Sequence, residues 1–176
     1  MFKKLNLFSK TEMKVLEFIS KKDGELYERQ IAGGAKISTG SANAILKSFF
    51  QAGLIRQIRK GRMLFYSGND DNPLLRQFKV FLTMNELMPI ISKIAPYSRR
   101  IVLYGSASEG REGEGSDVDL FILSNEKEKI RRFLDAHGNI QAVILDNSEF
   151  ANLQKADKPF YDRISSGIEM HGDRYG

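Results

Sequence analysis

The chain has 176 residues, 41% of them hydrophobic, which fits one ordinary domain or two small ones and excludes a wholly disordered chain. It contains no cysteine, which excludes disulfides and thiolate zinc sites and predicts a protein of the reducing cytoplasm. No segment approaches the length of a membrane span and the basic start has no cleavage pattern, so we expect a soluble, cytoplasmic protein.

The charge is unevenly distributed along the chain. Of the formal net charge of +5, residues 1–72 contribute +6, from 13 Lys and Arg against 7 Asp and Glu. Residues 73–176 contribute −1, from 14 against 15. A basic first part favours a polyanionic partner such as duplex DNA, although charge alone does not define a fold.

The first 70 residues combine helical patterns with a pair of strands. Apolar residues recur at helical spacing over 5–20, over 26–32, and from Thr39 to a stop at Gly53. The pattern then changes to two strands, 54–59 and 62–66, joined by a tight turn at Lys60-Gly61. The sequence therefore predicts three short helices followed by a β-hairpin.

This order of elements, with residues 37–66 in particular, resembles the winged helix-turn-helix domains of prokaryotic regulators. The resemblance implies that the helix from Thr39 enters the major groove of duplex DNA and that the hairpin meets the phosphates. The implied DNA-binding residues are Thr39, Ser41, Asn43, Lys47, Arg59, Lys60 and Arg62. Winged helices also serve as dimerisation or protein-docking modules, so a homodimer or a protein partner is the alternative.

The rest of the chain predicts a helical link and an α+β domain. Turn-forming residues at 67–72 mark a boundary, and Pro73 fits the start of a helix that Pro89 is expected to kink or end. We predict a winged-helix domain at 1–70, a linking segment at 71–97, and a second domain at 98–176 with a small mixed sheet. The second domain is expected to contain strands at 100–104, 118–123 and 140–145, a helix at 125–136, and helices around Phe150 and Ile164.

The motif that best indicates a chemistry lies in this second domain. Gly105-Ser106 follows an apolar run, and Asp117-Val118-Asp119 begins another one ten residues later. On a strand, Asp117 and Asp119 point to one face while Val118 turns to the other. Paired carboxylates suit Mg²⁺, and a glycine turn allows backbone amides to approach phosphate oxygens. The pattern predicts adjacent metal and phosphate sites, although a merely solvated acidic strand end is the simpler interpretation.

The segment from Gly105 to Asp119, followed by an apolar strand, resembles the DNA polymerase beta type nucleotidyltransferases, and most closely the minimal ones. The resemblance covers residues 99–172. It implies that Gly105 and Ser106 bind ATP or another nucleoside triphosphate, and that Asp117 and Asp119 are catalytic and bind Mg²⁺. By the same resemblance, an acceptor hydroxyl attacks the α-phosphate and pyrophosphate leaves. The acceptor would be a protein or an RNA.

One part of the family pattern is missing. A third carboxylate normally comes from a later strand, but 139–145 contains no acid, and alternation places Gln141 at that position. An amide neither supplies negative charge nor accepts a proton as a general base. Asp146 lies just beyond the strand, where capping a helix near Ser148 is favoured over reaching inward. Arg111, in the glycine-rich loop, either contacts phosphates or is simply solvated.

Three functions follow from these observations. The leading hypothesis is a magnesium-dependent nucleotidyltransferase directed by a winged-helix DNA-binding domain. The alternative is a DNA-binding transcriptional regulator whose nucleotidyltransferase fold binds nucleotide without turnover, a hypothesis favoured by Gln141 and the basic first part. A third hypothesis is an antitoxin-like protein that acts by binding a partner.

Overall fold

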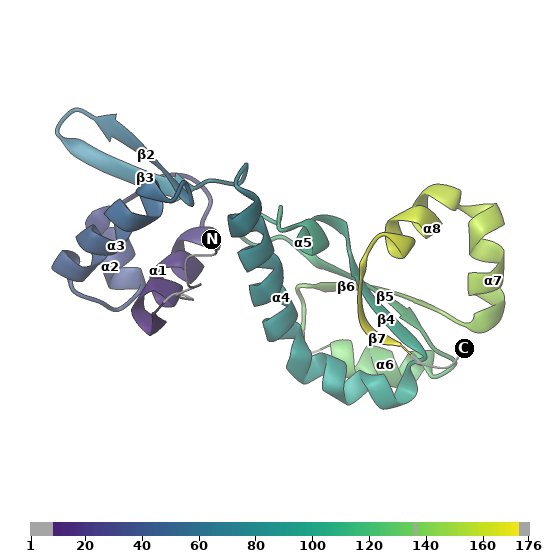
Figure 1. The fold of residues 1–176 in the computed structure, drawn as a ribbon. Helices are drawn as coiled ribbons and strands as arrows, with labels where there is room; N and C mark the ends of the chain where they lie inside the picture. The colour runs from purple at the N-terminus through teal and green to yellow at the C-terminus, as the bar shows by residue number, and fades with distance from the viewer. Residues whose placement is uncertain (1–8, 136, 173–176) are drawn as a thin grey trace, which may run out of the picture. The chain divides into compact units, whose positions relative to one another are not determined.

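The structure is a computed structural model that describes residues 9–135 and 137–172. It is an α+β fold with helices and two small sheets, and the chain divides into two compact units, residues 1–79 and 80–176. Figure 1 shows the course of the chain through the two units, which we describe separately. Within the described residues, no helix combines the length and apolar character needed to cross a membrane.

The first unit contains the predicted three helices and hairpin. Its elements are α1 (Lys10–Ser20), β1 (Leu26–Tyr27), α2 (Glu28–Gly34), α3 (Thr39–Gln51), β2 (Ile55–Lys60) and β3 (Met63–Gly68). The strands form one antiparallel sheet in the order β1-β3-β2. The short strand β1 was not predicted, because two residues carry no readable period and it forms only by pairing with β3. The predicted helical residues 5–8 lie outside the described residues.

Local sequence signals begin and end these elements. Ser9 caps α1 in a capping box with Glu12, and the Ser38 hydroxyl accepts a hydrogen bond from the Ser41 amide at the start of α3. The hairpin turns at Gly61, whose φ of 61° is a conformation that glycine adopts without strain. Residues from all three helices and the hairpin then share one core, which includes Leu16, Ile31, Leu46, Phe49, Ile55 and Tyr66.

Helix α4 (Pro73–Ile94) crosses the division between the units, with Lys79 and Val80 on either side of it. It starts at Pro73, as predicted, but it does not end at Pro89, which lies inside the helix with its ring exposed. Proline lacks the N–H that would bond the carbonyl four residues earlier, a loss that water offsets on an exposed face. Buried apolar residues on both sides of Pro89, Leu87, Ile90, Ile91 and Ile94, anchor the helix to the core of the second unit.

The second unit is built on a four-stranded mixed sheet in the order β6-β5-β4-β7. The strands are β4 (Arg100–Tyr104), β5 (Val118–Leu123), β6 (Ile140–Leu145) and β7 (Ile168–Gly172). β5 runs parallel to β6 and antiparallel to β4, and β7 pairs with β4 in antiparallel orientation with a register shift. The first three strands match the predicted ranges, whereas β7 was not predicted.

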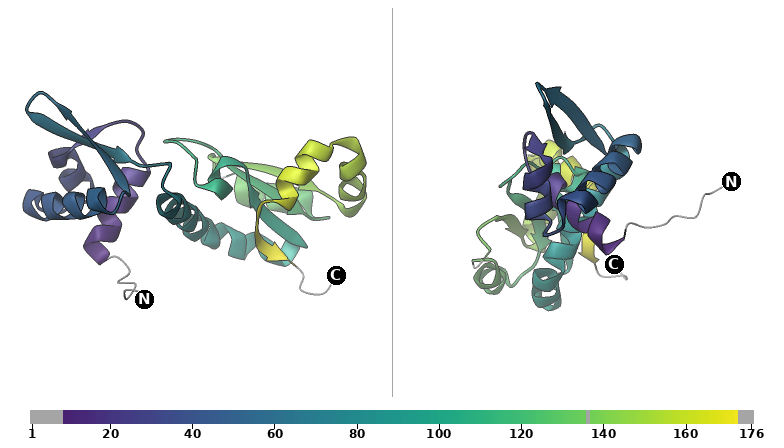
Figure 2. Two further views of the ribbon diagram at one scale, coloured as in Figure 1. Left: turned by 45° about the horizontal axis from the view of Figure 1, so that its top comes forward. Right: turned by 90° about the vertical axis from the view of Figure 1, so that its left-hand side faces the viewer.

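Helices cover both faces of this sheet. α6 (Lys127–Leu134) and the second part of α4 pack on one face, in a core that includes Leu103, Leu120 and Ile122. α7 (Asn147–Ala156) and α8 (Lys158–Ser165) pack on the other, against Val102, Tyr104 and Phe121. Figures 1 and 2 show these helices on opposite sides of the strands. Because side chains alternate along β5, successive residues of this strand pack into two separate cores.

Candidate functional site

The strand register brings three polar side chains into one row. Tyr104, the last residue of β4, is opposite Asp119 of β5, and Asp119 is opposite Gln141 of β6. Val118 and Leu120, on either side of Asp119, pack into the core formed with α4 and α6. Because neighbours on a strand point to opposite faces, Asp119 belongs to the face that α7 and α8 cover. Asp117, two residues earlier and directly before β5, is expected to lie on this same face.

Gly105 lies directly against the Asp119 carboxylate. It begins the short helix α5 (Gly105–Glu109) with a φ of 71°. A Cβ atom built on Gly105 would lie 2.3 Å from Oδ2 of Asp119, a separation that real Cβ atoms do not show. The backbone conformation therefore favours glycine, and a larger residue here would displace the Asp119 carboxylate. Asp117 and Asp119 form an acidic pair that begins 12 residues after Gly105 in the sequence. The fold brings this pair next to the glycine turn.

The Asp117 carboxylate is exposed and has Gln141 as its neighbour. Nε2 of Gln141 lies 3.5 Å from Oδ2 of Asp117, which is at the long limit of a hydrogen bond in which the amide donates. Within the described residues, no group of three or more Asp, Glu, His or Cys side chains is placed to hold a metal ion. Two carboxylates suit one Mg²⁺, whose remaining positions water and phosphate oxygens fill. The donors therefore fit one cation better than a pair.

Asp146, the other candidate for a third acid, caps a helix. Its Oδ1 accepts hydrogen bonds from the backbone amides of Ser148 and Glu149 at 2.9 and 3.0 Å, and Lys127 lies 3.2 Å from its other oxygen. The Glu149 amide first, and then the Ser148 hydroxyl and Lys127, hold the pKa of Asp146 well below its ordinary value. These bonds occupy Asp146 at the start of α7.

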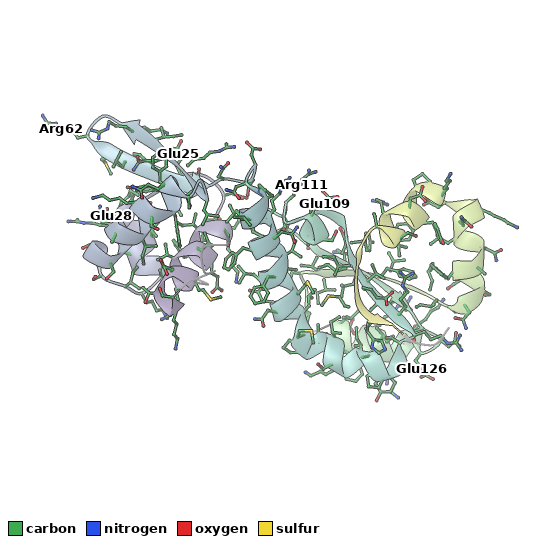
Figure 3. All side chains as sticks on the ribbon, in the orientation of Figure 1. Glu25, Glu28, Arg62, Glu109, Arg111 and Glu126 are labelled. Carbon is green, nitrogen blue, oxygen red and sulfur yellow. The ribbon has the colours of Figure 1, made fainter. Side chains whose placement is uncertain are left out.

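The loop between α5 and β5 is held by local contacts. Gly110 ends α5 in the left-handed conformation, and the Gly113 amide donates to the Ser116 hydroxyl at 2.9 Å. Arg111 forms a 3.0 Å ion pair with Glu109, and Figure 3 labels both exposed side chains. Ser106 is exposed on α5, and its carbonyl accepts a hydrogen bond from the Arg111 amide.

Tyr104 is a neighbour of the acidic pair that the sequence did not single out. It is 6% exposed, and its ring packs edge-on against Phe160 of α8 with 5.6 Å between centroids. Burial first, and the charge of Asp119 second, raise the pKa of Tyr104, while Arg163 of α8 lowers it. Only tertiary packing brings α8 here, so no local signal in the sequence could have identified these residues.

In the first unit, the residues implied to bind DNA lie in different settings. Thr39, Ser41 and Lys47 are exposed on α3, whereas Asn43 is half-buried and donates a 2.7 Å hydrogen bond to Glu28. Arg59, Lys60 and Arg62 are exposed on the hairpin, with Arg62 at its tip (Figure 3). Lys60 forms a 2.6 Å ion pair with Glu25 and lies over the ring of Phe65.

The fold and the acidic pair define a small sheet domain with a glycine turn against two strand-borne carboxylates. The family model described as "Polymerase beta, Nucleotidyltransferase" matches residues 85–172, which are 88 of the 176 residues. The chain therefore belongs to this nucleotidyltransferase family. The comparison with curated proteins finds no match.

Several solved structures are similar to this chain at low identity. A protein from Sulfolobus solfataricus described as a nucleotidyltransferase is 18% identical, with a TM-score of 0.37, over 62% of this chain and 94% of its own. A toxin–antitoxin structure with AMP-PNP is 19% identical, with a TM-score of 0.35, over 52% and 74%. Sso10a-2, a DNA-binding protein from Sulfolobus solfataricus, is 16% identical, with a TM-score of 0.37, over 51% and 95%. Because these scores are low, the family assignment rests on the family model.

Proposed function

We propose that the protein is a magnesium-dependent nucleotidyltransferase that moves a nucleoside monophosphate from ATP, or another nucleoside triphosphate, to a macromolecular acceptor. The close approach of Gly105 to the carboxylate of Asp119, two residues after Asp117, supports this proposal most directly. A turn that presents phosphate-binding groups is useful only if the cation ligands lie next to it. Membership of the nucleotidyltransferase family supports the same chemistry.

Different residues of the site would bind the cation and the phosphates. Asp117 and Asp119 would hold Mg²⁺, which when bound neutralises phosphate charge and lowers the pKa of a coordinated hydroxyl. Gly105 allows the backbone at the start of α5 to approach the phosphates, and the exposed Ser106 hydroxyl is available to donate a hydrogen bond. An acceptor hydroxyl, from a protein or an RNA, attacks the α-phosphate and pyrophosphate leaves.

Gln141 favours a second candidate function. Its amide occupies the register position opposite Asp119, so the site lacks the third negative charge that a second cation requires. A site that binds one cation and a nucleotide without turnover fits a DNA-binding transcriptional regulator that senses the nucleotide. An antitoxin-like role, in which the protein acts by binding a partner, is the third candidate and predicts co-purification with the product of a neighbouring gene.

Transfer of label separates the first two functions. Purified protein is incubated with α-labelled ATP, Mg²⁺ and cell extract, and macromolecules are separated and counted. Label on a macromolecule that disappears with Asp117→Ala or Asp119→Ala, but not with Asp135→Asn on the surface, supports the enzyme. Absence of label, together with nucleotide binding that needs both aspartates, supports the regulator.

We further propose that residues 1–70 form a winged-helix domain that binds duplex DNA. The exposed hairpin with Arg59, Lys60 and Arg62 supports contacts to phosphates, and the exposed Thr39, Ser41 and Lys47 of α3 support contacts in the major groove. Asn43 is the weakest of these candidates, because reading a base requires it to give up its hydrogen bond to Glu28. Dimerisation or docking of a protein through the same surface remains the competing role.

A further inference from the structure

The second unit contains a cation on α8, Arg163, that has no part in the function proposed so far. Arg163 is exposed on α8, and its guanidinium carbon lies 5.4 Å from the centroid of the Phe160 ring. The Phe160 ring packs edge-on against Tyr104, which is opposite Asp119 in the strand register. A continuous series of contacts therefore leads from the acidic pair to Arg163.

Asp119 of β5 and the helix that carries Arg163 lie on the same face of the sheet. Ile164, next to Arg163, is buried with Val102, Tyr104 and Phe121 in the core between the sheet and α8. Asp119 is two residues before Phe121 on β5, so its side chain belongs to this same face.

Arg163 and Arg111 differ in the groups that they contact. In the part of the chain that the structure describes, Arg163 contacts an aromatic ring and no carboxylate forms an ion pair with it. Arg111, by contrast, is paired with Glu109 at 3.0 Å. A guanidinium stacked on a ring keeps its N–H donors free along its edges, and these match the oxygens of a phosphate.

We propose that Arg163 binds the phosphates of the nucleotide held at the Asp117–Asp119 site. The assignment rests on the proposed nucleotide site. One Mg²⁺ leaves the triphosphate with negative charge, and the two aspartates add to it, so a cation on the facing helix offsets part of the remaining charge. Phe160 holds the side chain in place, which lowers the entropy that Arg163 loses on binding.

The test compares variants by calorimetric titration with ATP in the presence of Mg²⁺. Arg163→Gln is expected to weaken ATP binding roughly tenfold, as the loss of a charge-assisted hydrogen bond predicts. Arg163→Lys retains the charge and is expected to lie between Arg163→Gln and wild type. Arg132→Gln, on α6 at the opposite face, is the matched control and is expected to bind as wild type does. Melting temperatures without ATP are expected to be unchanged in all three variants.

Two negative results are distinguishable. If the wild type binds ATP in a manner that requires Asp117, and Arg163→Gln binds equally well, the assignment of Arg163 is wrong and the nucleotide site stands. If the wild type binds no ATP, the nucleotide site and the role of Arg163 both fail. A tenfold loss in Arg163→Gln that Arg132→Gln does not share supports the assignment.

Discussion

Asp119 of β5 is opposite Gln141 of β6 in a parallel register, so an amide occupies the position next to the acidic pair on the neighbouring strand. Its Nε2 lies 3.5 Å from the Asp117 carboxylate. The geometry to add a third oxygen ligand is therefore present, and only the charge is missing. Under the proposed function, residue 141 decides whether a third carboxylate stands beside Asp117 and Asp119.

Replacing this amide by an acid is expected to create the missing ligand. Gln141→Glu adds a carboxylate beside Asp117 and Asp119, so Mg²⁺ affinity is expected to rise by on the order of tenfold, equivalent to about 1.4 kcal/mol. Without Mg²⁺ the three negative charges repel, and the melting temperature is expected to fall. Calorimetric titration with Mg²⁺ and thermal melts with and without the cation measure both effects.

The control for this variant is Gln154→Glu, which makes the same chemical change on the exposed surface of α7. It is expected to leave Mg²⁺ affinity and the melting temperature as they are in the wild type. Label transfer by Gln141→Glu above that of the wild type would show that charge limits turnover. Equal Mg²⁺ affinity in Gln141→Glu and wild type would show that residue 141 does not face the cation.

The contact between Gly105 and Asp119 gives a second prediction. Gly105→Ala places a Cβ where Oδ2 of Asp119 now lies, so the carboxylate must move and Mg²⁺-dependent ATP binding is expected to weaken roughly 10- to 100-fold. The positive φ adds strain of about 1–2 kcal/mol. Urea unfolding measures the strain, and calorimetric titration measures the binding.

Gly115→Ala separates these two effects. Gly115 has a φ of 74°, similar to that of Gly105, but no atom lies within 4 Å of the Cβ that alanine would add. This variant is therefore expected to carry similar backbone strain and to bind ATP as the wild type does. If both variants lost ATP binding to the same extent, the effect would come from backbone strain and not from displacement of Asp119.

The ion pair between Lys60 and Glu25 predicts unequal roles for the basic residues of the hairpin. Arg62, at the hairpin tip, is expected to contribute more to DNA binding than Lys60, because Lys60 must first break its 2.6 Å ion pair with Glu25. The slope of log affinity against log salt concentration is negative, and each phosphate contact removed reduces its magnitude by about 0.9. Fluorescence anisotropy with a labelled duplex at several salt concentrations is expected to show this change for Arg62→Gln.

Two comparisons control the DNA experiment. Lys60→Gln is expected to change the slope less than Arg62→Gln does. Lys155→Gln, on α7 in the other unit, removes the same charge and is expected to change neither the affinity nor the slope. A loss of affinity that is equal in all three variants would reflect net charge and not an interface on the hairpin.

Much of this fold could be predicted from the sequence, because its elements carry local signals. Ser9, Gly53 and Pro73 mark helix ends, and alternation along residues 118–123 indicates which side chains share a face. The same alternation predicted that Gln141 lies beside the acidic pair. What depends on distant pairing could not be predicted, including β7, which exists only because it pairs with β4. Tyr104 and Arg163 belong to this second class, since α8 reaches β4 only through packing.

The bonds that cap α7 predict how stability depends on pH. The pKa of Asp146 is held below its ordinary value of 3.8, first by the Glu149 amide and then by the Ser148 hydroxyl and Lys127. A lowered folded pKa means that the unfolded chain takes up the proton first, so the stabilisation is present above pH 4 and is lost as the pH falls through that pKa. Asp146→Asn keeps an oxygen acceptor but has no charge to lose. Wild type is therefore expected to melt at a higher temperature than Asp146→Asn at pH 7, and the difference is expected to shrink steadily below pH 4. A difference that stays constant across this range would mean that the charge of Asp146 does not stabilise the start of α7.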